Sequence, residues 1–454
     1  MTKYKAYPEY KDSGVKWLGE IPRNWQVLRG KYVFREIKEL SYRGDETLLS
    51  VSEYYGVKPR QDTIEEGEFI SRAESLIGYK KCQINDLAMN IMLAWKTGLG
   101  VSKYEGIISP AYSVFRFDTA IALPEYMNYL LRTKIYTDHF KSLSTGVIDS
   151  RLRLYPEVFG TVKILLPRFD EQVMVSAFLD HETAKIDKLI EKQQQLIELL
   201  KEKRQAVISH AVTKGLNPDV PMKDSGVEWL GEVPEHWRVS RVKNFAKIES
   251  GHTPSKTKSE YWVNCIIPWV SLNDSKQLKD VDYIEDTTYK ISELGMANSS
   301  AHLLPARAVV FTRDASIGLS AITTKPMAVS QHLIAWLCNE RFVVPEFLLL
   351  VFYAMEKEFE RYTFGATIKT IGMDNVRGLR SAFPPIDEQH KLIEWAFKKL
   401  EKIKFSINKV EDIISLLQER RTALISAAVT GKIDVRDWVA PDMQDAEEPQ
   451  ETTA

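Results

Sequence analysis

Two stretches of the chain carry apolar residues at alternating three- and four-residue steps, the spacing of a narrow stripe along one face of an α-helix. The first stripe consists of Ile186, Ile190, Gln193, Leu196/Ile197, Leu200, Arg204, Val207/Ile208 and Ala211. The second lies 217 residues further on and consists of Ile403, Ile407, Val410, Ile413/Ile414, Leu417, Arg421, Leu424/Ile425 and Ala428. The pattern predicts two long helices, and from the adjacent pairs we assign to their seams Leu196, Val207, Ile414 and Leu424.

The two stripes match in length and spacing, which favours an antiparallel coiled coil formed within the chain. Two ordinary core helices, one in each of two domains, are the alternative that the pattern leaves open. About 40 residues at roughly 1.5 Å per residue give a rod of ~60 Å. Arg204 and Arg421 interrupt the stripes, and each is expected either to lie on a solvated flank or to contact another subunit.

The ends of both predicted helices carry typical boundary residues. An acidic pair opens each one, Asp170-Glu171 in the first and Asp387-Glu388 in the second. The aspartates can cap free backbone N–H groups, and the glutamates place negative charge near the positive end of the helix dipole. Gly215 and Gly431 follow the last apolar residues and are expected to end the helices.

The chain also repeats itself outside the helices. Residues 12–25 read DSGVKWLGEIPRNW and residues 224–237 read DSGVEWLGEVPEHW, with ten of fourteen positions identical at an offset of 212 residues. Residues 203–213 and 420–430 (KRQAVISHAVT and RRTALISAAVT) match at an offset of 217, as do the two Asp-Glu-Gln triplets that open the helices. The sequence therefore consists of two halves of nearly equal length.

Each half predicts a mixed α/β globule between its shared segments. Residues 111–117 and 332–337 read as strands, and Pro124 and Pro345 each open a helix, which ends near residue 146 in the first half and near residue 362 in the second. The expected fold class is α/β (mixed α+β) with long helices, with two domains in a pseudo-twofold arrangement separated by an intramolecular antiparallel coiled coil. The expected boundaries are 1–169 for the first domain, 170–215 for the first long helix, 216–222 for a linker, 223–386 for the second domain, 387–432 for the second long helix and 433–454 for an acidic, disordered tail.

Composition adds a few limits to this picture. Hydrophobic residues make up 44% of the 454 residues and charged residues 27%, as in a soluble globular protein. The net charge is −1, so any DNA-binding surface must be local. Cys82, Cys265 and Cys338 stand far apart, which argues against a metal site and against a disulfide framework and fits a cytoplasmic location. The most apolar stretch, residues 342–355, is too short to cross a bilayer, so we expect no membrane partner.

The order of these motifs resembles that of the specificity subunits of type I restriction-modification systems, over nearly the whole chain. The resemblance is carried by a DSGVxWLGExP motif, an α/β domain and a long helix beginning near Asp-Glu-Gln, followed by the same series again. Further strings add to it, namely GIISPAY at 106–112, SGHTPS at 250–255, IPWVS at 267–271, and the LPRFDEQ and PPIDEQ segments that lead into the helices.

The resemblance implies a subunit that reads a bipartite, asymmetric DNA target, with one half-site for each of two target-recognition domains. It also implies double-stranded DNA as ligand, with two methyltransferase (modification) subunits and restriction/translocase subunits as protein partners. S-adenosylmethionine, ATP and Mg²⁺ are then expected on those partners, and no cofactor on this chain. A non-catalytic coiled-coil adaptor whose globular domains bind protein instead of DNA is the alternative, and the near-zero net charge favours it.

The sequence lacks the motifs of the catalysts that such a complex needs. It contains no GxxxxGK[ST] loop for ATP phosphates, no FxGxG cofactor loop and no Asn/Asp-Pro-Pro-aromatic motif of the amino-methyltransferases. Pro218-Asp219 is not followed by the acid-x-Lys of a nuclease, and Pro441-Asp442 lies in the acidic tail. We therefore expect no catalytic residue in this chain.

Long polar side chains on loops are the candidates for reading DNA, because base edges are read in the major groove while phosphate contacts fix the register. In the first domain these candidates are Lys80, Lys81, Lys96, Lys103, Tyr104, Ser150, Arg151 and Arg153. In the second they are His252, Thr253, Ser255, Lys256, Arg313, Ser316, Gln331, His332, Thr367, Lys369 and Asn375. For any single lysine or arginine, an ordinary solvated surface position is the alternative.

The segments after Gly146 and Gly365 are the more specific candidates among these loops. They lie at matching places in the two halves but differ in sequence, VIDSRLRLY against ATIKTIGMD, as two different half-sites require. Four repeated tryptophans, Trp17, Trp25, Trp229 and Trp237, cannot discriminate between half-sites and are expected to pack where each domain begins.

Overall fold

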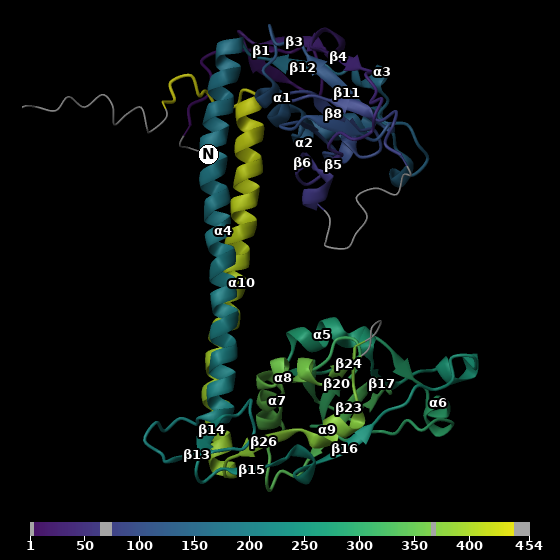
Figure 1. Cartoon of the computed structure of the whole chain (residues 1–454), viewed down its shortest axis with the longest axis vertical. Coiled ribbons are helices and arrows are strands. Elements are labelled where there is room, and N and C mark those ends of the chain that lie inside the picture. The colour runs from purple at the N-terminus through teal and green to yellow at the C-terminus, as the bar shows by residue number, and fades with distance from the viewer. Residues whose placement is uncertain (1–3, 64–74, 365–368, 440–454) are drawn as a thin grey trace, which may run out of the picture. The chain divides into compact units, whose positions relative to one another are not determined.

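The computed structural model describes residues 4–63, 75–364 and 369–439 (Figure 1). The chain divides into two compact units. Unit 1 contains Met1–Gln193 together with Asp412–Ala454, and unit 2 contains Gln194–Glu411. Each unit includes one part of each long helix, so that unit 1 is built from both ends of the chain and unit 2 from its middle.

The main sheet of unit 1 has four antiparallel strands in the order β4–β11–β8–β9. Their bounds are β4 (Phe34–Ile37), β11 (Tyr112–Phe117), β8 (Leu87–Asn90) and β9 (Leu99–Val101). Successive side chains of a strand point to opposite faces. Phe115 and Phe117 of β11 therefore join the core cluster that includes α1 (Pro124–Leu131) and α2 (Lys134–Leu143), and Val114 joins a cluster on the other face.

The main sheet of unit 2 repeats this order as β16–β23–β20–β21, with β18 added at the edge. The bounds are β16 (Ala246–Ser250), β23 (Leu333–Cys338), β20 (Val309–Thr312), β21 (Ser320–Thr323) and β18 (Tyr283–Ile284). Ile334 and Trp336 pack with α7 (Pro345–Ala354), while Leu333 and Ala335 face a second cluster. The repeat seen in the sequence is therefore a repeat of sheet topology.

The remaining elements surround these sheets. In unit 1 they are β1 (Tyr10–Asp12), β2 (Glu20–Pro22), β3 (Gln26–Arg29), β5 (Leu49–Ser52), β6 (Gly56–Pro59), β7 (Lys80–Cys82), β10 (Gly106–Ile108), α3 (Pro156–Phe159) and β12 (Lys163–Leu166). In unit 2 they are β13 (Met222–Asp224), β14 (Glu232–Pro234), β15 (Arg238–Arg241), β17 (Ile267–Val270), α5 (Ser275–Asp280), β19 (Lys290–Ile291), α6 (Glu293–Ala297), β22 (Ala328–Val329), α8 (Glu356–Arg361), β24 (Thr363–Phe364), β25 (Thr370–Ile371), α9 (Met373–Gly378) and β26 (Arg380–Phe383).

The helix predicted after Pro124 is two helices, α1 and α2, and the helix predicted after Pro345 is likewise divided into α7 and α8. Thr133 separates the first pair, because its hydroxyl donates to the carbonyl of Leu130 and its backbone is extended. Such a local hydrogen bond competes with the regular helical pattern. Met355 separates the second pair, with φ and ψ of −85° and 5°.

The two long helices, α4 (Phe169–Thr213) and α10 (Ile386–Val429), are antiparallel (Figure 1). The last turns of α4 place Ala211 and Val212 in the core of unit 2. The last turns of α10 place Ala428 and Val429 in the core of unit 1. Since each helix begins in the unit where the other ends, the prediction of a self-paired antiparallel helical rod is confirmed.

The residues between the helices keep the seven-residue period that the sequence predicts, with one correction. Ile186, Ile403 and Val410 are buried, and the other seam residues that are at least half-buried are Ile190, Gln193, Leu200, Val207, Ile407, Ile414, Leu417 and Leu424. Leu196 was assigned to the seam wrongly, since its side chain is 40% exposed. Its neighbour Ile197 is the half-buried residue, because an unbroken alternation of four- and three-residue steps from Ile186 passes through 197.

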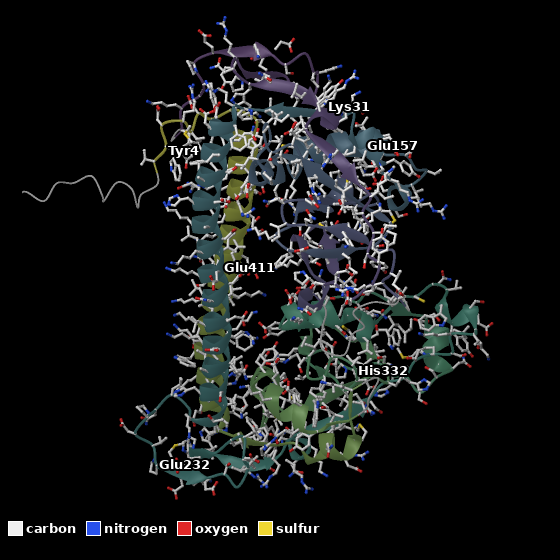
Figure 2. All side chains as sticks on the ribbon, turned by 45° about the horizontal axis from the view of Figure 1, so that its top comes forward. Tyr4, Lys31, Glu157, Glu232, His332 and Glu411 are labelled. Carbon is white, nitrogen blue, oxygen red and sulfur yellow. The ribbon has the colours of Figure 1, made fainter. Side chains whose placement is uncertain are left out.

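The two arginines within the stripes are held by contacts inside the chain. Arg421 pairs with Asp187 across the two helices of unit 1, with Nε 2.8 Å from Oδ1. The Arg204 guanidinium lies over the Tyr353 ring of α7 in unit 2, 5.2 Å from its centroid. Other charged side chains project from α4 and α10 along their length (Figure 2).

The Asp-Glu-Gln triplet fastens each long helix to the unit in which it begins. Glu171 accepts a hydrogen bond from the indole N–H of Trp25 at 3.0 Å, and Glu388 accepts the same bond from Trp237 at 3.1 Å. Trp25 and Trp237 are buried, so each indole N–H would lack a partner without that carboxylate. The glutamates therefore do more than complement the helix dipole.

The glutamine of each triplet binds the loop that leads into an earlier helix of the same unit, α1 in unit 1 and α7 in unit 2. Gln172 accepts from the Leu123 N–H and donates to the carbonyls of Ile121 and Pro167. Gln389 makes the equivalent three bonds, with Val344, Phe342 and Pro384. Asp170 and Asp387 were expected to cap the helices from just outside them. The helices begin one residue earlier, at Phe169 and Ile386, so both aspartates lie inside the first turn.

The boundary predicted for a disordered tail at residue 433 is too early. Ile433 and Val435 are buried in the core of unit 1, and Trp438 packs against Phe178. The Asp434 N–H donates to the Lys5 carbonyl at 2.8 Å, which joins the two ends of the described chain. The rest of the predicted tail, from residue 440 onward, lies outside the described residues.

Replacing Ile197 with alanine should lower the free energy of unfolding by about 1–2 kcal/mol, because the side chain fills the seam between the helices. The neighbouring change Leu196→Ala removes a similar volume from an exposed position and should cost less than about 0.5 kcal/mol. Urea denaturation of the two variants measures the difference. Equal losses would show that the seam does not pass through residue 197.

Candidate nucleic-acid interface

In each unit, the loops that differ between the two halves of the sequence lie at one end of the main sheet. In unit 1, β4 ends, β8 ends and β11 begins at the same end, since Tyr112 pairs with Asn90 and Val114 with Ile37. In unit 2 the corresponding strands β16, β20 and β23 meet in the same way, with Leu333 opposite Thr312. We call this edge the loop end of each unit.

A shared backbone hydrogen bond fastens the segment that follows the helices to each loop end. The Leu154 N–H donates to the Ile91 carbonyl at 2.8 Å in unit 1, and the Ile371 N–H donates to the Arg313 carbonyl at 2.9 Å in unit 2. Leu154 and Ile371 are 217 residues apart, the offset of the helical repeat. The segments in which the two halves differ are thus held in the same way by the same scaffold.

Hydrogen bonds join several predicted readers of unit 2 into one chain at the loop end. His332, which is labelled in Figure 2, lies with Nδ1 2.7 Å from Asp314 Oδ2 and Nε2 3.1 Å from Gln331 Nε2. The Thr253 hydroxyl donates to Gln331 Oε1, and the Thr370 hydroxyl donates to Asp314 Oδ1. Four separate loops therefore meet through side chains at this end.

Asp314 is the centre of charge in that cluster. Burial by itself raises the pKa of this carboxyl, but the hydrogen bonds from Thr370 and His332 and the charge of Arg313 outweigh it and hold the pKa below its usual value. Arg313 Nε lies 3.4 Å from Asp314 Oδ1, so the guanidinium of this predicted reader is already paired with a carboxylate of the protein. Ala315, at φ +61°, lies in the turn that brings the Lys369 carbonyl within 2.8 Å of its N–H.

The loop end of unit 1 is cationic. Lys96 and Lys141 both lie over the Trp95 ring, at 5.1 and 4.6 Å from its centroid, and Lys141 also pairs with Asp149 at 2.8 Å. That ion pair braces the segment carrying Ser150, Arg151 and Arg153, all of which are exposed. Lys80 belongs to the same end, because its ammonium donates to the Tyr112 carbonyl, and burial lowers its pKa.

Some predicted readers lie away from the loop ends. Lys103 and Tyr104 are exposed, but they follow Ser102, whose carbonyl accepts from Asn85 at the opposite end of the β8–β9 hairpin from Asn90. At roughly 3.3 Å per residue, the hairpin separates the two positions by ~15 Å. They therefore do not join Lys96.

The remaining candidates are less tightly placed. Lys81 lies in β7, 3.9 Å from Glu46, and Asn375 is half-buried on α9. Ser255, Lys256 and Ser316 are exposed on loops of unit 2, and the Ser255 hydroxyl bonds Thr257 at 2.9 Å. Thr367 lies outside the described residues.

Four residues that the sequence did not single out take part in these surfaces, namely Asp314, Thr370, Trp95 and Lys141. An aspartate beside Arg313 is easily passed over, because a carboxylate repels phosphate. Its neighbour Arg313 was the available signal, since an adjacent arginine and aspartate can form an ion pair. Thr370 lies 56 residues from Asp314 in sequence, and the sheet register alone brings them together.

The repeated tryptophans pack inside their units as expected. Trp25 and Trp237 are in the two cores, Trp17 stacks on His139, and Trp229 donates to the Arg380 carbonyl. Among the described residues no helix is long and apolar enough to cross a membrane, and no group of three or more histidine, cysteine, aspartate or glutamate side chains could hold a metal ion.

The substitution Asp314→Asn should destabilise the protein at neutral pH by about 1 kcal/mol, because it removes a charged acceptor that is partly screened by solvent. The folded-state pKa of Asp314 is lowered, so its contribution is present above the usual carboxyl pKa of 3.8 and is lost as the pH falls through the lower folded value. The difference between the urea midpoints of the two proteins should therefore stay constant from pH 7 down to about pH 4 and shrink below pH 3.8. The change Asp374→Asn, at a 99% exposed side chain, is the matched control and should have little effect at either pH.

Comparisons with known proteins agree with this architecture. Residues 234–418 match the family model described as type I restriction modification DNA specificity domain. The type I restriction enzyme MjaIX specificity subunit of Methanocaldococcus jannaschii is 24% identical, and the match covers 96% of this chain and 99% of that protein.

Two solved structures share the fold. One comes from work on complex assembly and conformational transition of the type I R-M system, with a TM-score of 0.70, 14% identity, and 91% of this chain and 99% of that chain covered. The HsdS subunit from Thermoanaerobacter tengcongensis has a TM-score of 0.50 and 15% identity over 91% of this chain and 98% of its own. The paired long helices and the duplicated α/β units are thus the fold of these solved structures, and in sequence the chain is similar to type I restriction-modification specificity subunits.

Proposed function

We propose that this chain is the DNA sequence-recognition subunit of a type I restriction-modification complex and reads a bipartite, asymmetric target. The loop end of each unit reads one half-site. The observation that carries the proposal is that both loop ends share one scaffold, down to the same backbone hydrogen bond, and yet present different side chains. A symmetric reader would need identical loops, whereas here the scaffold repeats and the loops on it differ.

The two loop ends fit different parts of the recognition task. In unit 1 the exposed lysines and arginines, Lys96, Arg151 and Arg153, offer phosphate contacts and bidentate contacts to guanine. In unit 2 the series of side-chain hydrogen bonds that links Thr253 to Asp314 through Gln331 and His332 fixes the orientation of uncharged donors and acceptors. This local placement of charge accounts for DNA binding by a chain whose net charge is −1.

Partner subunits would use the outer faces of the paired helices. Leu199, Phe405 and Leu416 are more than half exposed on helices whose seam faces are already occupied. We take these positions as candidate contacts for the partners, since an apolar patch on an outer face marks a docking surface. We propose that two modification subunits and the restriction subunits bind there, and that they carry S-adenosylmethionine, ATP and Mg²⁺, while this chain performs no chemistry of its own.

Methylation sequencing of cells that carry this chain with its modification partners should show methylated adenines in one split motif. The double change Arg151→Ala and Arg153→Ala should relax or abolish recognition in one half of that motif and leave the other half unchanged. Lys103→Ala is the control and should leave the motif intact. It removes an exposed lysine from the end of the β8–β9 hairpin that lies away from the loop end. The absence of any split motif with the unaltered chain would contradict the proposal, and favour an adaptor.

Shortening the helical pair should change the unread spacer of the motif. Because Arg421 meets Asp187, the heptad Lys185–Glu191 faces the heptad Leu417–Ala423, and these two must be deleted together. We expect a shorter spacer or loss of binding, since one heptad spans ~10 Å. Deletion of Lys185–Glu191 with Lys402–Asn408 is the comparison. These two heptads do not face each other, so the stretches of α4 and α10 that lie between the two deletions would pair one heptad out of register. An unchanged spacer after the matched deletion would show that the helices do not set the distance.

A further inference from the structure

The side-chain amide of Gln331 is exposed and yet fixed in orientation. Gln331 immediately precedes His332 at the loop end of unit 2. Its Oε1 accepts a hydrogen bond from the Thr253 hydroxyl, and its Nε2 lies 3.1 Å from His332 Nε2. An exposed glutamine with no partner would turn freely, so these two contacts restrict it.

The hydrogen-bond roles along the chain follow from Asp314. Its carboxylate is held in the ionised state and can only accept, so the proton between the two residues belongs to His332 Nδ1. In the neutral ring His332 Nε2 then has a lone pair and no proton, and it accepts from Gln331 Nε2. Turning the amide over would bring two acceptors together, Gln331 Oε1 and His332 Nε2, so this ring state determines the position of the amide oxygen and nitrogen.

The backbone holds Thr253 and Gln331 next to each other. The His252 N–H donates to the Val329 carbonyl at 3.1 Å. A Cβ at Gly251 would lie 1.8 Å from the same carbonyl oxygen, so only glycine permits this approach. The indole of Trp269 donates to the His252 carbonyl at 3.2 Å and supports the loop from the other side.

One hydrogen and one lone pair of the Gln331 amide remain unused. A carboxamide has two donor hydrogens and two acceptor lone pairs. The contacts with Thr253 and His332 occupy one of each. A carboxamide that presents a free donor and a free acceptor along one edge matches the N7 acceptor and the N6 donor that adenine shows in the major groove. Guanine offers two acceptors at this edge and therefore leaves the amide oxygen without a partner.

We propose that Gln331 reads one adenine in the half-site bound by unit 2, and that Thr253 and His332 are positioning residues for its amide. The inference rests on the proposed function. The equivalent place in unit 1 supports it: Pro110 and Ala111 precede β11 as Gln331 and His332 precede β23, and neither has a side chain that can hydrogen-bond. The device therefore belongs to one half-site alone.

The first test is methylation sequencing with the full chain in its complex. Gln331→Ala should make one adenine position of the split motif degenerate, and Gln331→Glu should disfavour adenine there because a carboxylate cannot donate to N7. Thr253→Val should weaken selection at the same position, while Thr253→Ser keeps the hydroxyl and should restore it. Lys243→Ala, an exposed change just before β16 and so at the end of the sheet opposite the loop end, is the control and should leave the motif unchanged.

The second test uses base analogues in duplexes bound by the purified complex. At the position assigned to Gln331, 7-deazaadenine lacks the N7 acceptor and purine lacks the N6 amino group, and each should weaken binding by the unaltered complex roughly ten- to hundredfold. The Gln331→Ala complex should bind adenine and both analogues equally at that position. The same analogues at other adenines should weaken binding equally in the two complexes.

The outcomes separate this inference from the proposed function. If the unaltered chain gives no split motif, the proposed function fails and the inference fails with it. If that motif is present and both Gln331 variants keep it, only the inference is overturned. It is also overturned if both variants assemble normally with the partners but methylate no site, because Gln331 would then be needed for the structure of the loop and not for the choice of a base.

Discussion

The hydrogen bond from a buried indole to the glutamate at the start of each long helix is the contact on which the architecture depends. Trp25 meets Glu171 and Trp237 meets Glu388. Both partners would be costly to bury alone, because the indole N–H and the carboxylate each lose water. Together they fix where each long helix leaves its globular part, and the glutamine that follows fixes the loop before α1 or α7. The direction of the helix is thereby coupled to the position of the sheet.

That coupling allows the loop ends to vary. The strands β8 and β20 end at equivalent places, and the same backbone hydrogen bond secures the segment beside each. Side chains beyond that point carry little of the core, so they can change without loss of packing. In unit 1 the loops place lysines over the Trp95 ring. In unit 2 they carry the side-chain hydrogen bonds that join Asp314 and His332. A frame that both units share, with loops that differ, would suit the proposed reading of two half-sites.

The sequence predicted the parts of this structure that repeat or are periodic. The seven-residue period and the duplicated motifs were sufficient for the long helices, their antiparallel pairing and the two α/β parts. Leu196 was misassigned because it and Ile197 both fit a window of three- and four-residue steps, and only an unbroken count distinguishes them.

The candidate readers were predicted less completely, for reasons of tertiary structure. Thr253, Gln331 and His332 were found because they are polar and lie on loops, but their connection through Asp314 depends on strand register. Lys103 was grouped with Lys96 because they are close in sequence, whereas the reversal of the chain in the β8–β9 hairpin places them at opposite ends.

The joining of the chain's two ends in unit 1 has a consequence for synthesis. Ala428, Val429, Ile433 and Val435 complete the core around Trp25, and the Asp434 N–H bonds the Lys5 carbonyl. Unit 2 is formed from one continuous stretch, Gln194–Glu411, and so contains all that it needs before translation finishes. Synthesis in chain order therefore completes unit 2 first, while residues 4–193 of unit 1 keep apolar surface uncovered until the final turns of α10 are made.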